Sequence, residues 1–406
     1  MGTLRWQQLL DAAIAESSSQ SLSRIDAEVL IALRVAVYQL RFLARIPTRA
    51  AINESVELVK RARKRSAASF VNAVLRKIAA GSSKDGAWAP PEITGDSAEE
   101  LAVGSSHPLW LVERWARFYG LDAARSICTY NQCAPVTALR LRRPEANAHL
   151  LAEGIELESG ALLASARRVQ HGAISSSASI RSGLCVIQDE ASQLVAALVG
   201  HGEQILDCCA APGGKTLALA DRNPRSIIIA AELHSHRARL LRRLMRAVHP
   251  QTAGANVNVL AADARHLPLS LDFDRVLVDV PCSGTGTLAR NPEIKWRLTD
   301  RDLVDLQQRQ FEILRSAMGR VAIGGRVIYS TCSLEREENE DVVERSLSER
   351  PAFRVIDCAA ELDRLQGDRE LNWRDSSSLT SGPYLRTLPG IQPCDGFFAA
   401  ILEREK

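Results

Sequence analysis

The stretch I-L-D-C-C-A-A-P-G-G-K-T, from Ile205 to Thr216, decides the fold of the larger part of this chain. An apolar run leads into an acid, a turn with two glycines follows, and the apolar positions after it suit a helix. This order predicts a strand, a tight turn and a helix N-terminus, where free backbone N–H groups and the helix dipole converge. The stretch therefore favours a nucleotide-like ligand in an α/β sheet, although a glycine pair alone is equally compatible with a turn that binds nothing.

The ending G-K-T invites comparison with the P-loop of nucleotide triphosphatases. That motif requires a glycine at position 209, where this chain has Cys209, and the loop also contains no G-x-G-x-x-G. The loop is therefore neither an ATPase P-loop nor a standard dinucleotide fingerprint.

The bulk composition indicates ordinary globular domains. The chain has 406 residues, 46% of them hydrophobic and 24% charged, which allows two or three domains. No apolar run approaches the ~20 residues of a membrane span and no leader opens the chain, so we expect a cytoplasmic protein without a membrane partner. The nine cysteines are scattered without zinc spacing, which predicts free thiols and no metal site.

The charge is unevenly distributed. Residues 1–80 hold 13 Lys/Arg and 6 Asp/Glu, a net +7 (13 − 6), whereas the whole chain is +3 and the remainder therefore −4 (3 − 7). A basic end on a nearly neutral body suggests a polyanion partner, with a merely solvated helical face as the alternative.

The first 80 residues show helical periodicity. Apolar residues at helical spacing predict helices over 26–44, 50–63 and 67–80, and the first twenty residues look poorly suited to close their core. The second helix ends in a basic cluster: Lys60, Arg61, Arg63, Lys64 and Arg65. Residues 81–106 are rich in Gly, Ser, Pro and acids, which predicts a linker. Residues 107–185, with a helix from Leu109 to about Thr129 and strands at 137–141 and 180–186, are interpreted as a small α+β module.

Beyond the glycine loop, strands and helices alternate regularly. Strands are predicted at 226–232, 258–263, 275–281 and 325–331, which favours a parallel sheet covered by helices on both faces. Four predicted strands end on an acid, and these ends share one edge of the sheet: Asp207, Glu232, Asp263 and Asp279. Because gathered carboxylates repel each other, a partly cationic, hydroxyl-rich ligand suits this edge better than a phosphate. Each acid alone is also compatible with a helix N-cap.

Two cysteines follow strand ends on the same edge. Cys282 stands in D-V-P-C-S-G-T-G-T and Cys332 in Y-S-T-C-S-L. A free thiol is less than about a tenth ionised near neutral pH, and nearby cations raise that fraction. Candidate cations lie in the loop after the first cysteine: Arg290, Lys295 and Arg297. Two thiols beside Asp279 suggest covalent catalysis with a proton-handling partner, and no His–Asp pair supports a protease.

These residues carry a family resemblance. The chain resembles RNA (cytosine-5) methyltransferases of the RsmB/Sun type, within the NOP2/Sun group. The matching stretches span residues from about 186 to 400 in family order: Q-D-E-A-S-Q (188–193), D-C-C-A-A-P-G-G-K-T (207–216), A-E-L-H-S-H-R (231–237), A-D-A (262–264), D-V-P-C-S-G-T-G (279–286), N-P-E-I-K-W (291–296), Y-S-T-C-S-L (329–334), E-E-N-E (337–340) and D-G-F-F-A-A (395–400).

The resemblance also divides the chain. It implies a NusB-like all-α RNA-binding domain at 1–80, a linker at 81–106, an RRM-like α+β module at 107–185 and a Rossmann-like class I methyltransferase domain at 186–406. The NusB-like part is carried by A-V-Y-Q-L (36–40), R-I-P-T-R-A-A-I-N-E-S-V-E-L-V-K (45–60) and F-V-N-A-V-L-R-K (70–77). The sequence G-T-L-R-W (2–6) resembles a point partway into that domain, which implies that its first helices are missing.

The resemblance implies S-adenosylmethionine as the cofactor, with a sulfonium and a ribose diol that agree with the acid-lined edge. The implied cofactor-binding residues are Cys209, Ala210, Ala211, Pro212, Gly213, Gly214, Lys215, Glu232, Arg237, Asp263 and Asp279. It further implies that Cys332 adds to C6 of cytosine, that Cys282 helps to remove the C5 proton and expel Cys332, and that Asp279 protonates N3.

Two positions depart from the family pattern. Glu232 stands where Asp is more common, and Arg336 stands where Pro is common. The implied substrate is 16S ribosomal RNA, with tRNA or 23S RNA as alternatives, and a monomer is expected. A non-catalytic RNA-binding or ribosome assembly factor is the alternative of another class, although it predicts a damaged site and this chain retains both cysteines, Asp279 and the glycine loop.

Overall fold

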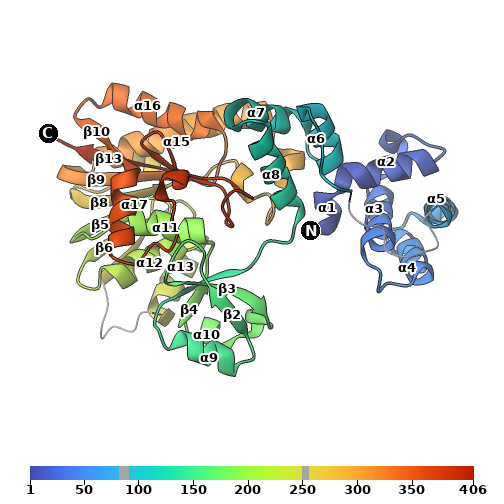
Figure 1. Cartoon of the computed structure of the whole chain (residues 1–406), viewed down its shortest axis with the longest axis horizontal. Coiled ribbons are helices and arrows are strands. Elements are labelled where there is room, and N and C mark those ends of the chain that lie inside the picture. Colours follow the sequence, from blue (N-terminus) through green and yellow to red (C-terminus); the bar gives the residue numbers. More distant parts are fainter. Residues whose placement is uncertain (82–90, 249–255) are drawn as a thin grey trace. The chain divides into compact units, whose positions relative to one another are not determined.

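A computed structural model describes residues 1–81, 91–248 and 256–406. Residues 82–90, which belong to the predicted linker at 81–106, lie outside the described residues. The chain forms two compact units, one of Met1–Ala134 with Leu288–Arg297 and one of Pro135–Thr287 with Leu298–Lys406 (Figure 1). The finer division into four segments that the sequence suggests remains a proposal. Within the described ranges, no helix is long and apolar enough to cross a bilayer.

The first unit is helical. Its α-helices in the main body are α1 (Gly2–Arg5), α2 (Gln7–Ser17), α3 (Ala27–Phe42), α4 (Thr48–Arg61), α5 (Ala68–Ala80), α6 (Ala98–Ser105), α7 (Leu109–Tyr119) and α8 (Leu121–Gln132). The three helices predicted from periodicity are present within a few residues of their expected bounds. The helical pattern predicted from Leu109 is two helices, because Gly120 at φ 86° ends the first.

The prediction that the first twenty residues would close the core poorly was wrong. Trp6, Leu10 and Ile14 are buried in the same cluster as the apolar faces of α3, α4 and α5. The polar and small residues between them lie on the outer face of α2. Because the apolar positions are so widely separated by these residues, the amphipathic character of this helix was not recognised in the sequence.

The segment Leu288–Arg297, which includes α14 (Ile294–Arg297), belongs to the first unit. Its Lys295 is 1% exposed and donates hydrogen bonds to the carbonyl oxygens of Arg5 at 2.8 Å and Ser106 at 2.7 Å. The Trp296 indole N–H donates to the carbonyl of Leu4 at 2.7 Å. Burial lowers the pKa of Lys295 to about 7. The expectation that Lys295 would serve as a cation for Cys282 is therefore wrong, because its ammonium is already bound within the first unit.

A large sheet of nine strands, counted over the described residues, organises the second unit. Its order is β11-β12-β13-β9-β8-β5-β6-β7, with β10 paired to β13. The strands are β5 (Gln204–Asp207), β6 (Ile227–Glu232), β7 (Asn256–Ala261), β8 (Phe273–Asp279), β9 (Val321–Thr331), β10 (Phe353–Ile356), β11 (Thr380–Ser381), β12 (Tyr384–Thr387) and β13 (Phe397–Arg404). The five predicted from the sequence, β5 to β9, are parallel, whereas β10 to β13 are antiparallel additions that the sequence did not predict.

Helices cover both faces of this sheet (Figure 1). One buried cluster joins it to α11 (Glu190–Val199), α12 (Gly214–Arg222) and α17 (Cys358–Gly367), and another joins it to α15 (Asp300–Met318) and α16 (Glu340–Glu349). A third cluster packs α13 (Ser235–Val248) against β6 and α12. This is the Rossmann-like α/β fold expected from the alternating pattern, and the strand order reverses at β5, where such sheets bind ligands.

A four-stranded antiparallel sheet lies in the same unit, in the order β2-β3-β1-β4. Its elements are β1 (Ala138–Leu141), α9 (Ala146–Ala152), β2 (Glu156–Ser159), β3 (Ala166–His171), α10 (Ala178–Arg181) and β4 (Cys185–Ile187). The strand predicted at 180–186 was wrong in its first half, because a short helix occupies it. Buried Glu190 attaches this sheet to the larger one by accepting the N–H groups of Ala161, Leu162 and Leu163 at 2.7–3.2 Å.

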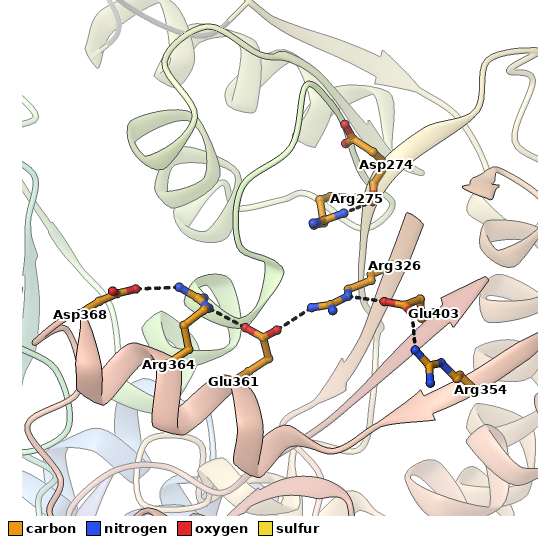
Figure 2. Close-up of polar contacts among 8 residues, drawn as sticks. All are labelled: Asp274, Arg275, Arg326, Arg354, Glu361, Arg364, Asp368 and Glu403. Carbon is orange, nitrogen blue, oxygen red and sulfur yellow. Dashed lines mark hydrogen bonds and ion pairs between the residues drawn. The ribbon is translucent and has the colours of Figure 1, made fainter. Parts of the chain in front are cut away.

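Ion pairs connect α17 to the strands of the large sheet (Figure 2). Acidic and arginine side chains alternate along this series of ion pairs. Arg326, for example, contacts Glu361 at 2.5 Å and Glu403 at 2.9 Å. Arg354 and Arg364 extend it at either end with contacts of 2.7–3.0 Å. Each of these arginines therefore has at least one carboxylate beside it.

Candidate active site

A cavity of about 580 Å³ opens at the carboxyl ends of β5, β6 and β8. Eight of the predicted site residues line it: Cys209, Ala211, Glu232, Arg237, Asp263, Asp279, Cys282 and Cys332. Five others of the glycine loop do not line it: Ala210, Pro212, Gly213, Gly214 and Lys215. The volume lies in the range of small-molecule sites, so the cavity has room for a nucleoside-sized ligand.

The glycine loop is shaped by packing as much as by access to the cavity. Gly213 has φ 114°, and a Cβ there would lie 2.6 Å from the Leu241 side chain of α13. Lys215 extends to Asp279, with Nζ 2.8 Å from Oδ2, and the Thr216 hydroxyl donates to Asp207 Oδ2 at 2.7 Å. The residues that would bind phosphate and magnesium in a P-loop are thus bound to carboxylates of the protein.

Three of the four strand-end acids line the cavity, and the fourth does not. Asp207 is 1% exposed, and burial raises its pKa to about 7. Asp207 ends β5 at the carboxyl edge as predicted, but it does not line the cavity, because its carboxylate is buried and accepts the Thr216 hydroxyl. The other three acids each have a basic neighbour: Glu232 lies 3.7 Å from Arg237, Asp263 2.7 Å from Arg265, and Asp279 2.8 Å from Lys215. The mutual repulsion assumed from the sequence is therefore largely offset.

The two cysteines predicted to carry the chemistry are adjacent. Cys282 Sγ lies 3.3 Å from Cys332 Sγ, and both side chains are partly exposed in the wall of the cavity. The hydrogen bond with Cys332, followed by burial, holds the pKa of the Cys282 thiol well above its usual range. The raised pKa favours the protonated thiol at Cys282, and either sulfur can be the donor in the contact between them.

Glu338 fixes both cysteine loops. It is fully buried, and its carboxylate accepts Ser283 N–H at 2.8 Å and the hydroxyls of Ser283 and Ser333 at 2.5 Å each. The Gln310 amide of α15 donates to it at 2.8 Å. Since each serine directly follows one of the two cysteines, a single carboxylate sets the distance between the loops.

Two glycines, Gly286 and Gly396, support the loop of Cys332 through backbone hydrogen bonds. Gly286 donates its N–H to the Cys332 carbonyl at 2.9 Å and accepts the N–H of Gly396 at 2.8 Å. A Cβ on Gly286 would lie 2.2 Å from the Gly396 carbonyl oxygen, so neither position has room for a side chain. This contact joins the stretches 279–286, 329–334 and 395–400 behind the cavity.

Comparison with known proteins identifies this arrangement. The model of the 16S rRNA methyltransferase RsmB/F family matches residues 196–403, and that of the NusB family matches residues 1–80. The chain belongs to the RsmB/F methyltransferase family. It is 35% identical, over 100% of its length and 89% of the other protein, to the probable ribosomal RNA small subunit methyltransferase B of Bacillus subtilis.

Solved structures agree with this assignment. The crystal structure of PH0851 superposes with a TM-score of 0.80 and 25% identity, over 99% of this chain and 88% of that one. A methyltransferase homologue from Pyrococcus horikoshii, at 23% identity, shares the fold with a TM-score of 0.61 over 77% of this chain and 100% of that one. As a member of this family, the chain is an RNA methyltransferase whose cofactor is S-adenosylmethionine.

The cavity fits that cofactor by its donor set. Glu232, the carboxylate at the end of β6, suits a ribose diol, and Asp263 follows the end of the neighbouring strand β7 by two residues. The wall also includes apolar Leu233, Ala264 and Ile313, which suit a purine ring. Two further cysteines, Cys208 and Cys209, line the cavity near this end. Burial holds the pKa of both thiols well above the usual range, so neither competes as a nucleophile for a sulfonium methyl group.

Sequence reasoning missed several residues of this RsmB/F site. His234, Arg265 and Arg309 also line the cavity; His234 was quoted only as part of A-E-L-H-S-H-R (231–237), and nothing in their local pattern marked the two arginines. Glu338 was quoted only as part of E-E-N-E, although three acids in four residues gave no sign that one of them was buried. Arg336, which departs from the family pattern, forms surface ion pairs with Asp341 at 2.9 Å and Glu344 at 3.4 Å.

Proposed function

We propose that this chain methylates C5 of cytosine in 16S ribosomal RNA through a covalent bond between Cys332 Sγ and C6 of the base. The observation that carries the proposal is the pair of sulfurs 3.3 Å apart in the wall of the cavity that also contains Asp279 and Glu232. Carbon 5 of cytosine is not nucleophilic by itself, and addition of a thiolate to C6 makes it enolate-like.

S-adenosylmethionine supplies the methyl group as a cationic sulfonium. Glu232 would accept the ribose hydroxyls, Asp263 would lie near the adenine, and Arg237 would close the cavity beside them. Glycine-loop residues 209–215 would lie beneath the cofactor, and Lys215 would act there through its ion pair with Asp279.

Asp279 is proposed to bind N3 of the base and to pass a proton to it, which Lys215 supplies through their ion pair. Its Oδ1 accepts the Ser330 hydroxyl at 2.8 Å while Oδ2 faces Lys215 at 2.8 Å, so the carboxylate is held in one orientation. A proton at N3 stabilises the electron density that Cys332 places on the ring, which lowers the barrier to addition.

Cys282 is proposed to act after methyl transfer. Before addition, its proton is kept by the hydrogen bond with Cys332. Once the Cys332 sulfur is bonded to C6, it no longer carries the charge that disfavours ionisation of its neighbour. Cys282, which is partly exposed, then loses its own proton to solvent, and its thiolate can help to remove the proton from C5. Elimination of Cys332 then restores the aromatic ring and frees the enzyme.

The substrate assignment rests on the family and on the named relative, which is a small subunit methyltransferase. A base inside a helix is inaccessible to the two sulfurs, so the target must leave its stack at a cost of a few kcal/mol. A single-stranded or loop cytosine is therefore the expected target.

The test is a denaturing gel of cysteine variants incubated with 16S RNA transcript and methyl-labelled S-adenosylmethionine. Cys282→Ala is expected to accumulate a slow-migrating, RNase-sensitive adduct, because Cys332 still adds but is not expelled. Cys332→Ala is expected to give no adduct and no turnover, and Cys133→Ala, an exposed thiol outside the cavity, should behave as the parent.

The other outcomes are equally informative. An adduct with Cys332→Ala alone would reverse the two roles. No adduct with either variant, beside an active parent, would exclude the covalent mechanism. Nucleoside analysis of the labelled RNA, with tRNA and 23S transcripts run in parallel, tests the base and the substrate separately.

A further inference from the structure

Helix α13 (Ser235–Val248) presents an unusual outer face. Ala238, Leu241 and Met245 are buried, the last two in a cluster with β6 and α12. At 100° per residue, four exposed arginines at positions i, i+3, i+4 and i+7 lie together on one flank of the helix, beside the buried side: Arg239, Arg242, Arg243 and Arg246. These four side chains, which we call the α13 arginine face, span about 10 Å along the helix axis.

Nothing on the helix neutralises this face. The sequence S-H-R-A-R-L-L-R-R-L-M-R-A-V (235–248) contains no acid, and like charges three and four residues apart destabilise a helix. Arg242 donates to the Val259 carbonyl at 3.0 Å. In the part of the chain that the structure describes, Arg239, Arg243 and Arg246 have no ion-pair or hydrogen-bond partner through their side chains.

The ion-paired arginines of the second unit contrast with this face. Those of the network in Figure 2 alternate with carboxylates at 2.5–3.0 Å. Even the basic cluster predicted to bind RNA is partly neutralised, because Lys60 pairs with Glu57 at 2.7 Å and Lys64 with Asp26 at 2.9 Å. The α13 arginine face is thus a concentration of positive charge without an internal explanation.

The helix also starts at the catalytic cavity. Glu232 ends β6, and Leu233, His234 and Arg237 line the cavity together with it. Arg239 follows two residues later and Arg246 seven residues after that, at about 1.5 Å of rise per residue. The face therefore extends from the wall of the cavity along the outside of the second unit.

We propose that the α13 arginine face binds the phosphate backbone of the substrate RNA beside the methylated nucleotide. The inference rests on the proposed function, since it locates the RNA of that same reaction. Arginine suits phosphate through its forked donors, and a row of four on one face matches a strand rather than a single anion. Such contacts position the RNA without selecting its sequence.

The experiment compares two triple variants of the full-length protein. Arg239→Gln/Arg243→Gln/Arg246→Gln removes three charges from the face, and Arg61→Gln/Arg63→Gln/Arg65→Gln removes three from the first unit. Binding of a fluorescent single-stranded fragment of 16S RNA is measured by anisotropy at several salt concentrations. Calorimetry with S-adenosylmethionine checks that the second unit is intact, because Arg237 and the cavity are unchanged.

The first variant is expected to bind RNA about 10- to 100-fold more weakly at low salt, and its slope of log K against log salt should fall by about 2 (roughly 0.7 per phosphate contact). Arg239→Lys/Arg243→Lys/Arg246→Lys, which keeps the charge, should recover most of the affinity. An RNA dissociation constant and salt slope within twofold of the parent, with cofactor binding intact, would overturn the proposal. Failure of the proposed function itself would appear separately, as a parent enzyme that binds RNA but forms no 5-methylcytosine.

Discussion

The two ends of the cavity are built in opposite ways. At the cysteine end, Ser283, Ser333 and Gln310 all donate hydrogen bonds to the carboxylate of Glu338. All four of these side chains are buried. At the cofactor end, the partners of the acids are exposed: Arg237 is 44% and Arg265 41% exposed. The difference teaches that the cysteine geometry is fixed before any ligand binds, whereas the ion pairs at the cofactor end can rearrange when a cofactor enters.

The strongest challenge to this comparison is Glu338→Gln. The substitution keeps the size of the side chain but turns one acceptor oxygen into a donor beside two serine hydroxyls. We expect kcat to fall about 100-fold, or ~3 kcal/mol, with the KM for S-adenosylmethionine unchanged.

A merely structural role is separated by a second readout. The pH profile of Cys282 and Cys332 alkylation by iodoacetamide should change in Glu338→Gln, because the negative charge of Glu338 also contributes to raising the pKa of Cys282, after the hydrogen bond with Cys332 and burial. Glu344→Gln, which removes a surface partner of Arg336, is the matched control. Unchanged turnover and alkylation would mean that the two loops hold their distance without the carboxylate.

Glu232→Ala sharpens the comparison at the cofactor end. Loss of the carboxylate should weaken S-adenosylmethionine binding about tenfold, as expected for hydrogen bonds to a charged acceptor, while kcat at saturating cofactor stays near the parent value. Glu232→Asp, the residue more common in the family pattern, should bind within a few-fold of the parent. Calorimetry measures both, and a dissociation constant unaffected by alanine would remove the ribose contact.

The smallest effect on turnover is expected for Asp207→Asn, whose effect is on stability. Burial raises the pKa of Asp207 to about 7 in the folded protein, above its ordinary value of 3.8. The folded state therefore holds a proton that the unfolded state has lost, so its contribution is complete below pH ~4 and is lost as the pH rises through 7.

Relative to Asp207→Asn, the parent should lose roughly 3 kcal/mol of stability between pH 5 and pH 8. Urea unfolding of both proteins at pH 5 and pH 8 measures this difference. Parallel pH dependences for the two proteins would mean that Asp207 is ionised in the fold and that its burial is offset by the Thr216 hydrogen bond.

Much of the second unit could be predicted from the sequence. The parallel strands β5 to β9 are continuous apolar runs between helices, and both cysteines and three of the strand-end acids lie where that pattern places them. The antiparallel strands could not be predicted, because β13 pairs with β9, which lies more than 60 residues earlier in the chain, and local sequence pattern does not encode such a pairing. The burial of Asp207, Lys295 and Glu338 could not be predicted either. Charged residues are usually exposed, and these three are buried only because segments distant in the sequence pack around them.

The hydrogen bond between Gly286 and Gly396 has a consequence for folding of the protein during its synthesis. During synthesis, the stretch that carries Cys332 leaves the ribosome before β13 exists, and β13 must then enter the sheet between β9 and β12. Until it does, the Gly286 carbonyl has no Gly396 N–H to accept, and the support behind the Cys332 loop is incomplete. The geometry around Cys332 is therefore completed only after residues 395–400 have been synthesised and β13 has paired with β9.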